Sequence, residues 1–339
     1  MNEITTIGID LAKNVFQVHG VDASGAVVVR KAIRRAQVLR FFEVLPRCLV
    51  GMEACATSHS WARAIAALGH EVRLMPPQYV KAYVKRNKND AADAEAICEA
   101  VRRPSMRFVA VKSAEQQAVL TMHRARELLI RQRTMLVNAL RARLAEFGIV
   151  GAQGIHRVCD LVAIVADERD ERVLAIARGV LRIVADQIAV LQGAIAEIDG
   201  RILAWHRSNE VSLRLAGMPG VGPVVASAIA ASVPDASVFR SGREFAAWLG
   251  LVPKQSGTGG KTWLGRISKR GDGYVRRLLV TGALTALTRS KAVKAMPWII
   301  GMKERSKRPM VIAVALANKM ARTAWAMMVR ATAYRASAA

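Results

Sequence analysis

Short apolar runs rich in β-branched residues dominate the first quarter of the chain and predict strands. The first run, Ile4–Asp10, fits no helical period, and the next two follow tight turns, as is typical of an antiparallel meander. Two more runs come later, each after a stretch with helical spacing. The predicted strands cover residues 4–10, 15–21, 26–30, 48–52 and 71–75, and the predicted helices cover residues 35–45, 58–68, 78–85 and a segment from about residue 90, after a basic link at 86–89.

From Ser113 onward the apolar spacing becomes that of long amphipathic helices. Ser113 and Gln116 have the spacing of a capping box, and one buried stripe continues to about Phe147. Residues 148–154 break this helix, and a second helical region is predicted over residues 167–206, with Val173 and Leu174 in its apolar stripe. Two long helices joined by a loop predict either a coiled-coil arm, which commonly dimerises, or an ordinary helical subdomain.

Glycines in the last third of the chain predict turns and loops between helices. The stretch 215–226 resembles a helix-hairpin-helix turn, in which Gly220 and Gly222 let backbone amides approach a phosphate. The alternative is a tight turn before an apolar helix. Ser241 is a predicted helix cap, residues 250–261 are predicted to form a flexible glycine-rich loop, and apolar helices are expected over residues 280–288 and 311–329.

Charge narrows the class of partner. The chain has 339 residues, with 51 Lys and Arg against 26 Asp and Glu, a formal charge of +25 and a pI near 11. An excess of this size repels itself in the folded state and usually persists because the partner is a polyanion. Aromatic residues make up only 5%, so phosphate contacts are expected to contribute more than base stacking.

Cysteine spacing and hydropathy exclude other classes. The four cysteines, at positions 48, 55, 98 and 159, include no CxxC pair, which argues against a zinc knuckle or a disulfide framework. The start of the chain has no cationic segment of a signal peptide, and the longest uncharged run, 215–234, is interrupted by glycine and proline. We therefore expect a cytoplasmic protein that does not cross a membrane.

Carboxylates at the ends of predicted elements are the first candidate site. The order β-β-β-α-β-α-β-α matches the ribonuclease H-like fold, in which the first and fourth strands are adjacent and face the start of a late helix. Asp10 and Glu53 follow those strands, and Asp90 and Asp93 share one face of the helix. Each residue alone is explained as a turn former, a solvated strand end or a helix cap. Gathered together, they predict a site for two Mg²⁺ or Mn²⁺ ions, and His59 and His70 are expected to lie outside it.

The second candidate site is a hydroxyl surrounded by cations. Ser256 and Thr258 lie in the glycine-rich loop, where a hydroxyl could attack phosphorus if a metal ion activated it. The alternative is a solvated basic loop. The cations expected to contact nucleic acid are Lys254, Lys261, Arg266, Lys269, Arg270, Arg276 and Arg277, with Asp272 as the one acid among residues 261–277.

Six short motifs are spread over nearly the whole chain and are specific only in combination. They are Gly8–Lys13, Gly51–Ala54, Asn87–Glu95, Pro219–Gly222, Phe245–Pro253 and Gly265–Gly271. Together they resemble the motifs of the DEDD insertion-sequence transposases, the "one-ten" family and its "eleven-eleven" branch, which are related to the Piv DNA invertase.

The resemblance implies an α/β plus all-α protein with a RuvC-like domain (1–112), a helical coiled-coil arm (113–207) and a helical transposase domain (208–339). It implies that Asp10, Glu53, Asp90 and Asp93 bind magnesium and that a serine forms a covalent phosphoserine with DNA. It also implies a non-coding guide RNA that selects donor and target DNA, and dimers or tetramers with a shared site.

The serine motif departs from the family pattern. Relatives often have Ser-Ser-Gly or Ser-Thr-Gly, whereas this chain has Ser256-Gly-Thr-Gly259. Alignment on Ser-Gly selects Ser256, and counting from Pro253 selects Thr258; we choose Ser256 because a primary hydroxyl is less hindered. Two other functions remain open: a RuvC-like metal-dependent nuclease or junction resolvase, and a non-catalytic nucleic-acid-binding protein.

Overall fold

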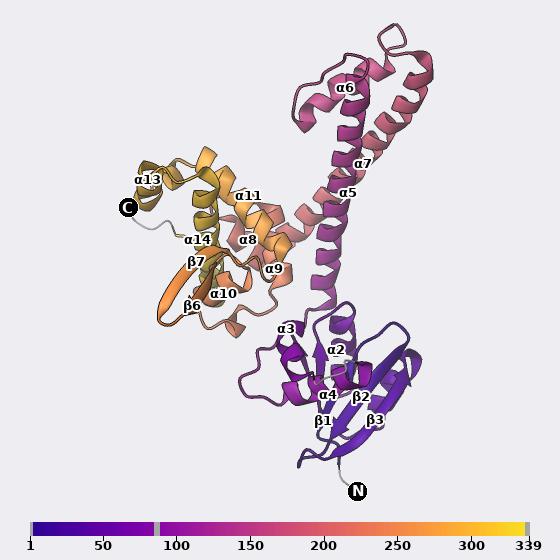
Figure 1. The fold of residues 1–339 in the computed structure, drawn as a ribbon, viewed down its shortest axis with the longest axis vertical. Coiled ribbons are helices and arrows are strands. Elements are labelled where there is room, and N and C mark those ends of the chain that lie inside the picture. The colour runs from indigo at the N-terminus through magenta and orange to yellow at the C-terminus, as the bar shows by residue number, and fades with distance from the viewer. Residues whose placement is uncertain (1–2, 85–88, 336–339) are drawn as a thin grey trace. The chain divides into compact units, whose positions relative to one another are not determined.

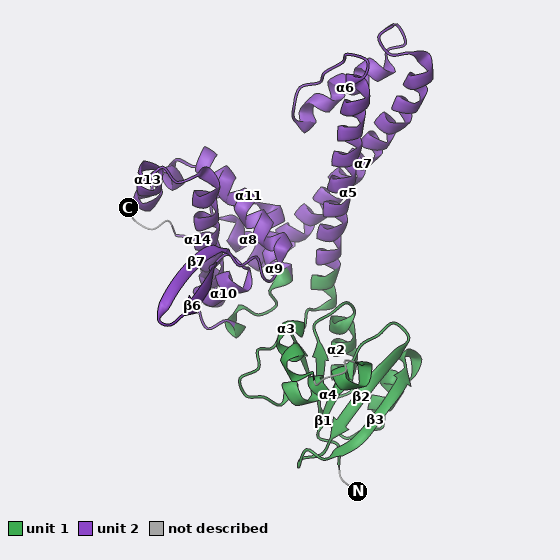
Figure 2. Ribbon diagram, viewed as in Figure 1, with its two compact units in different colours: residues 1–117, 232–238 green, residues 118–231, 239–339 purple. Residues whose placement is uncertain are grey.

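The computed structural model describes residues 3–84 and 89–335 (Figure 1). It has two compact units (Figure 2): Met1–Gln117 with Ser232–Val238, and Ala118–Ala231 with Phe239–Ala339. The predicted link at 86–89 falls mostly outside the described residues, as do the first two residues of the Asn87–Glu95 motif. The three domain boundaries given above stay predictions.

A five-stranded mixed sheet forms the core of the first unit, in the order β3-β2-β1-β4-β5. The first three strands pair antiparallel, whereas β4 is parallel to β1 and β5 is parallel to β4. The strands are β1 (Thr6–Asp10), β2 (Val15–Val21), β3 (Val27–Arg34), β4 (Leu49–Glu53) and β5 (Glu71–Met75). All five predicted strands are confirmed, and so is the adjacency of the first and fourth strands that a ribonuclease H-like fold requires.

Helices pack against this sheet and bury its apolar side chains. The core contains Ile7, Ile9, Phe16, Met52 and Leu74. The helices of this unit are η1 (Arg35–Gln37), α1 (Val38–Glu43), α2 (Ser58–Ala67), α3 (Pro77–Val80), η2 (Lys81–Tyr83) and α4 (Asp90–Val101). The single helix predicted over 35–45 is therefore a 3-10 turn followed by a short α-helix. The mixed α/β architecture is compatible with a ribonuclease H-like domain.

Two long helices open the second unit: α5 (Ala114–Ala145), the first residues of which fall in the first unit, and α7 (Ala175–Ser208). Between them lie a 3-10 turn, η3 (Ile155–Arg157), and the shorter helix α6 (Val158–Ala166). The predicted capping box is confirmed, because Gln116 N donates to Ser113 Oγ at 3.0 Å and Ser113 N donates to Gln116 Oε1 at 2.9 Å. Side chains from α5, α6 and α7, including Leu140, Leu161 and Leu181, form one core cluster.

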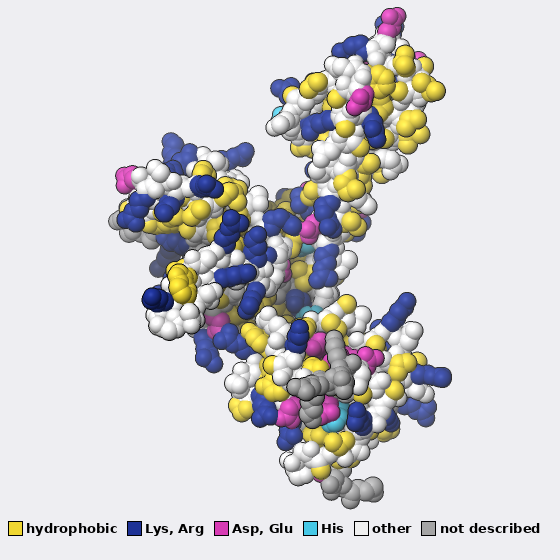
Figure 3. All heavy atoms as spheres, in the orientation of Figure 1, with side chains coloured by type: hydrophobic (Ala, Val, Ile, Leu, Met, Phe, Trp, Pro, Cys, Tyr) yellow, Lys and Arg dark blue, Asp and Glu magenta, His cyan; other side chains and the backbone are white. Residues whose placement is uncertain are grey.

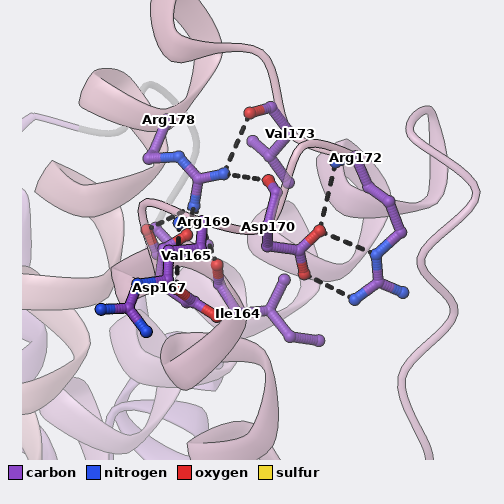
Figure 4. A network of polar contacts seen from close by, with 8 residues as sticks. All are labelled: Ile164, Val165, Asp167, Arg169, Asp170, Arg172, Val173 and Arg178. Carbon is purple, nitrogen blue, oxygen red and sulfur yellow. Dashed lines mark hydrogen bonds and ion pairs between the residues drawn. The ribbon is translucent and has the colours of Figure 1, made fainter.

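The predicted helix over 167–206 is wrong at its start. A loop separates α6 from α7; Val173 packs into the core from this loop and Leu174 is exposed. Figure 4 shows the reason: the Arg178 guanidinium donates to Ile164 O in the last turn of α6 at 3.0 Å and to Val173 O in the loop at 3.0 Å. An arginine that satisfies non-helical carbonyls stabilises the loop, and apolar periodicity does not report such bonds.

The same loop carries an ion pair. Asp170 Oδ2 accepts from Arg172 Nη2 at 2.6 Å, and hydrogen bonding to Arg172 lowers the pKa of Asp170 to about 2 (Figure 4). The carboxylate therefore stays ionised over the physiological pH range.

Helix α7 is long and apolar enough, by length and composition, to cross a membrane, and it is alone in this among the described helices. That is weak support for a membrane protein, because one face of α7 packs against α5 and α6 through Leu181 and Ile188. Its opposite face exposes apolar side chains, including Ile183 and Val190.

The remainder of the second unit is helical, with one β-hairpin. The helices are α8 (Glu210–Ala216), α9 (Pro223–Ser232, the last residue of which falls in the first unit), α10 (Gly242–Trp248), α11 (Gly273–Arg289), α12 (Lys291–Lys294), α13 (Pro297–Glu304) and α14 (Pro309–Arg330), and the hairpin strands are β6 (Pro253–Thr258) and β7 (Lys261–Ile267). A further 3-10 turn, η4 (Ala236–Val238), lies in the first unit. Ser241 caps α10 as predicted, since its Oγ accepts from Glu244 N at 3.3 Å.

Candidate functional site

Two neighbouring strands deliver acidic residues to the same edge of the sheet. In the parallel register of β1 and β4, Ile9 lies opposite Met52. Asp10 and Glu53 are the next residues of these strands, and both are half-buried. Because parallel strands end at the same edge, the two carboxylates leave the sheet there together.

Helix α4 brings the other two acids to this edge. It packs on β1 at Gly8, where a Cβ would lie 2.2 Å from Ala94 O and 2.3 Å from Cys98 N. Two residues along a strand advance about 6.6 Å, and four residues along a helix advance about 6 Å. The step from Gly8 to Asp10 therefore matches the step from Ala94 back to Asp90, and glycine permits the close approach.

Three carboxylates meet at this point. Asp10, Asp90 and Asp93 each offer an oxygen, and these oxygens all lie within 4.8 Å of one another. Asn89 fills the N-cap position of α4, with its Oδ1 accepting from Ala92 N at 2.8 Å, so Asp90 is not the cap. The first turn of a helix favours negative charge through its unsatisfied N–H groups. The alternative explanation of Asp90 as a helix N-cap is therefore excluded.

Glu53 lies at the neighbouring strand end but outside this three-residue group, as far as the described residues show. Burial raises the pKa of the Cys55 thiol, and the charges of Glu53 and Asp10 raise it further. The charges of both carboxylates therefore act on one thiol, which lies just after β4. The structure gathers three of the four predicted acids tightly and leaves Glu53 beside them.

The two nearby histidines have other partners, as predicted. His59 Nδ1 accepts from Lys112 N at 3.1 Å. His70 is buried, where its Nδ1 accepts from Cys48 N at 3.3 Å and its Nε2 donates to Phe42 O at 2.9 Å. Neither belongs to the carboxylate group found among the described residues.

The acidic group suits a hard divalent cation. Oxygen ligands around Mg²⁺ lie about 3–4 Å apart when each is about 2.1 Å from the ion, so oxygens within 4.8 Å need only a small closure. Asp90 is exposed and Asp10 and Asp93 are half-buried, which leaves room for water and phosphate. Three crowded carboxylates also repel one another, and a cation relieves this repulsion.

The predicted flexible serine loop is instead a β-hairpin. Strands β6 and β7 pair antiparallel, with Ser256 opposite Trp263 and Thr258 opposite Lys261. Gly259 and Gly260 form the turn with φ of +53° and +76°, the signs that a two-residue type I′ turn requires. Ser256 and Thr258 are both exposed on β6. The hairpin holds the candidate nucleophile on an extended backbone.

Trp263 is a residue that the sequence analysis missed. Directly opposed residues of an antiparallel pair project from the same face, so Trp263 stands beside Ser256 with 55% of its surface exposed. The signal was available, because Gly259-Gly260 between two extended runs is a hairpin signature.

The predicted cations divide into two groups. Lys254, Lys261 and Arg266 lie on the hairpin strands and are exposed. Arg276 Nη1 instead donates to Leu249 O at 2.9 Å and to Arg270 O at 3.1 Å, which fastens the base of the hairpin.

Arg277 is likewise engaged, because its Nη2 pairs with Glu127 at 2.7 Å. Asp272, the one acid of this stretch, caps α11 by accepting from Tyr274 N at 2.9 Å and Val275 N at 3.0 Å. Lys269 adopts a positive φ, and Arg270 is exposed. Figure 3 shows that lysine and arginine side chains outnumber carboxylates over the C-terminal helices on the face in view.

The helix-hairpin-helix-like turn joins α8 to α9. Gly220 has φ of +84°, and a Cβ there would lie 2.4 Å from Gly282 O, so its glycine is required by packing against α11. Gly222 is exposed at the start of α9, with open space around its Cα. Of the two glycines, only Gly222 is exposed, and contact of its amide with a phosphate stays a prediction.

Two family profiles, both of transposases, match separate parts of the chain. A profile of DEDD transposases of the IS110 type, described as "Transposase", matches residues 7–149. The profile described as "Transposase IS116/IS110/IS902 family" matches residues 212–296. The first match contains the acidic residues, and the second contains the serine hairpin.

Relatives that match over nearly the whole chain are also transposases. The chain is 51% identical to a "Probable family 20 transposase" of Pseudomonas aeruginosa, over 98% of this chain and 99% of the relative. It is 40% identical to the transposase for insertion sequence element IS1328 of Yersinia enterocolitica, over 98% and 99%. It is 37% identical to the transposase for insertion sequence element IS1111A of Coxiella burnetii, over 100% and 93%.

Proposed function

Because this chain belongs to the IS110 family of insertion-sequence transposases, we propose that it cuts and rejoins DNA through a metal-binding acidic site and a serine nucleophile. Membership in this family establishes that the chain is a transposase and that its substrate is DNA. The proposal concerns which residues do the chemistry. The observation that carries it is the group formed by Asp10, Asp90 and Asp93.

The acidic group holds one or two Mg²⁺ or Mn²⁺ ions through these three aspartates, with Glu53 joining from β4. When bound, such ions polarise the phosphate and lower the pKa of an attacking hydroxyl. The aspartates fix the position of the phosphate relative to the sheet edge. The cations of the hairpin offset the charge that develops on the phosphate oxygens.

Ser256 supplies the attacking oxygen. Its Oγ forms a bond to phosphorus, the bond from phosphorus to one sugar oxygen breaks, and that sugar oxygen takes up the proton that Ser256 loses. A sugar hydroxyl of another strand then forms a bond to phosphorus, the bond from phosphorus to Ser256 Oγ breaks, and Oγ takes up the proton that this hydroxyl loses. Each step exchanges one phosphoester for another. The exposed position of Ser256 on β6 supports this role, and Thr258 is the alternative nucleophile.

The chain also takes a non-coding RNA from its own element as guide, and it works as a dimer or tetramer. These two features of the proposal come from the family resemblance, together with the +25 charge. Sequencing RNA that co-purifies with the protein tests the first. Recovery of a structured RNA encoded beside the gene supports guidance, and RNA-free protein that recombines DNA contradicts it.

The test of the chemistry is recombination of a plasmid that carries the gene with its flanking DNA. Asp10→Asn, Asp90→Asn and Ser256→Ala should each abolish recombined product. Glu171→Gln, which removes an exposed carboxylate from the loop before α7, is the control and should recombine normally. Normal recombination by Ser256→Ala together with loss in Thr258→Ala would transfer the role to Thr258.

A RuvC-like metal nuclease is the second candidate, favoured by the same acidic group. It predicts hydrolysed DNA with free 5′-phosphate ends, no covalent adduct, and full activity in Ser256→Ala. A non-catalytic DNA-binding protein predicts no strand breakage in Mg²⁺ at all. The products of one cleavage reaction therefore separate the three functions.

A further inference from the structure

A groove of about 830 Å³ lies in the second unit, and its lining includes no residue of the acidic group or of the serine strand. Three helices form it: the start of α10, the first turn of α13 and the middle of α14. Pockets of this size accept a nucleotide-sized ligand. The residues that line it are Ser241, Gly242, Arg243, Trp298, Ala315, Asn318, Lys319, Arg322, Thr323, Trp325 and Ala326.

The lining combines aromatic rings with positive charge. The chain has only six tryptophans, and two of them, Trp298 and Trp325, line this groove and are half-buried. Arg243, Lys319 and Arg322 are exposed around them, and the lining includes no Asp or Glu. Flat aromatic surface beside cations, without carboxylates, is the chemistry that binds a base and its phosphate.

Tight packing holds the walls of the groove in place. At Gly242 a Cβ would lie 3.0 Å from Arg322 O and 3.1 Å from Arg322 Cα, so α10 and α14 are in close contact. Asn318 Nδ2 donates to Leu251 O at 3.1 Å, which ties α14 to the segment after α10. Preorganised walls lower the entropic cost of binding.

The wall contributed by α13 places an aromatic ring beside a cation. Lys319 Nζ lies 5.7 Å from the centre of the Trp298 ring, a cation–π contact between α14 and α13. The indole nitrogen of Trp298 is buried and has no hydrogen-bond partner among the described residues. The ring of Trp298, and not its N–H, is therefore the group that this wall offers to a ligand.

We propose that this groove binds an unpaired nucleotide of a single-stranded DNA or RNA segment, with the base on the tryptophan surface and the phosphate on Arg243 and Arg322. The proposal goes beyond strand cleavage and rests on the proposed function only in that the partner is nucleic acid. A duplex keeps its bases stacked on one another and offers only phosphates, so the tryptophans select an unpaired strand. Strand exchange and a guide RNA would each present such segments.

The test is binding of a short fluorescein-labelled single strand, followed by anisotropy in EDTA at physiological salt. Trp325→Leu and Arg322→Glu should each weaken binding of single-stranded oligonucleotides about tenfold or more. Trp325→Phe, which keeps an aromatic face, should recover most of the affinity. Arg330→Glu, which reverses the charge of an exposed arginine two turns further along α14, is the matched charge control and should have little effect. Thermal unfolding of each variant identifies those that fold.

Position is tested by photo-crosslinking an oligonucleotide that contains 5-bromouracil and mapping the linked peptides by mass spectrometry. Linkage to peptides with Trp298 or Trp325 supports the groove, and linkage only elsewhere overturns it.

The binding assay also separates the two kinds of strand. An equal loss of affinity for DNA and RNA in the variants indicates recognition of the shared nucleotide, whereas a loss of affinity for RNA alone assigns the groove to a guide. If folded Trp325→Leu and Arg322→Glu bind single strands like wild type, the proposal is wrong, and an accompanying change in oligomeric state would make the groove a protein interface. EDTA prevents cleavage, so this result does not depend on Ser256 or the acidic group.

Discussion

At the scale of single residues, Gly8 decides how closely the acidic helix approaches the first strand. A Cβ at this position would lie 2.2 Å from the backbone oxygen of Ala94. Gly8→Ala should therefore push α4 away from β1 and separate Asp10 from Asp90. We expect a loss of about 1–3 kcal/mol in the free energy of unfolding, measured with urea, and weaker Mn²⁺ binding, measured by electron paramagnetic resonance.

The control for this substitution is Gly193→Ala in α7, where a Cβ would meet no atom within 4 Å. Alanine is the better helix former, so this variant should gain about 0.5–1 kcal/mol and bind Mn²⁺ like wild type. Unchanged Mn²⁺ affinity in Gly8→Ala would contradict the idea that this close contact positions the carboxylates.

Trp263 is the second residue-scale case. It stands opposite Ser256 on an exposed hairpin, and nothing in the proposed chemistry requires an apolar ring there except contact with DNA. An indole wedged at a base step would open the strand beside the attacked phosphate. Trp263→Ala should slow formation of the covalent adduct at least tenfold in single-turnover assays, whereas Trp263→Phe should slow it less. Equal adduct rates in all three proteins would remove this role.

The gathering of three acidic residues could be predicted from the sequence, whereas side-chain partners could not. Asp10, Asp90 and Asp93 each lie at the end of an element, where topology alone brings residues together. The partners of Glu53 and Arg276 depend on packing that periodicity does not report. Arg276 donates to two backbone carbonyls that the sequence does not indicate, and its contact with a phosphate stays a prediction.

At the scale of elements, one buried histidine connects three helices of the second unit. His123 on α5 contacts Tyr274 on α11 through Nδ1 at 2.9 Å and Ser227 on α9 through Nε2 at 3.1 Å. The Ser227 hydroxyl donates to Pro223 O at 2.6 Å, so it accepts from His123 Nε2–H, and Nδ1 accepts from Tyr274. This arrangement uses the neutral imidazole.

The contact predicts a pH dependence of stability. Burial and the charge of Arg126 lower the pKa of His123 from 6.5 to about 4. Between these values the unfolded chain binds a proton that the folded chain excludes, so stability should fall as pH decreases from about 6.5 to about 4. The total is on the order of 3 kcal/mol for this group. Burial also lowers the pKa of His206, which acts in the same direction.

Urea unfolding at several pH values between 4 and 7 measures this slope. His123→Gln should reduce it, and His156→Gln, at an exposed position on η3, should leave it unchanged. A slope that is the same in wild type and His123→Gln would assign the acid sensitivity to other groups.

Element boundaries show where sequence patterns reach their limit. The strands of the sheet were predicted because each carries its own apolar run between turn residues. The start of α7 was not, because the bonds from Arg178 to the end of α6 and to the loop are visible only in the folded chain. The hairpin was missed because its strands are exposed and carry no apolar alternation, so the Gly259-Gly260 turn was its one signal.

At the scale of the whole molecule, α7 carries an apolar face that the chain itself does not cover. Ile183 and Val190 are each 64% exposed, and Val180 lies on the same face. Exposed apolar side chains at helical spacing are typical of a helix that pairs with another copy. This agrees with the oligomer in the proposed function.

Ile183→Glu should therefore shift the protein towards the monomer in size-exclusion chromatography with light scattering. A charge buried in a paired interface is costly, whereas the same charge in water is not. Gln192→Glu, exposed on another face of α7, adds the same charge and should leave the oligomer intact. Identical elution of both variants and wild type would exclude pairing through this face.

The central claim is that Ser256 becomes covalently linked to DNA in a reaction that needs the acidic group. The most direct measurement is peptide mass spectrometry of protein–DNA adducts trapped during a Mg²⁺ reaction on the element's own flanking DNA. We predict a phosphodiester on Ser256, absent in Ser256→Ala and in Asp10→Asn, with Thr258 unmodified. Strand breakage with free ends and no modified residue, or a modification on a residue other than Ser256, would contradict it.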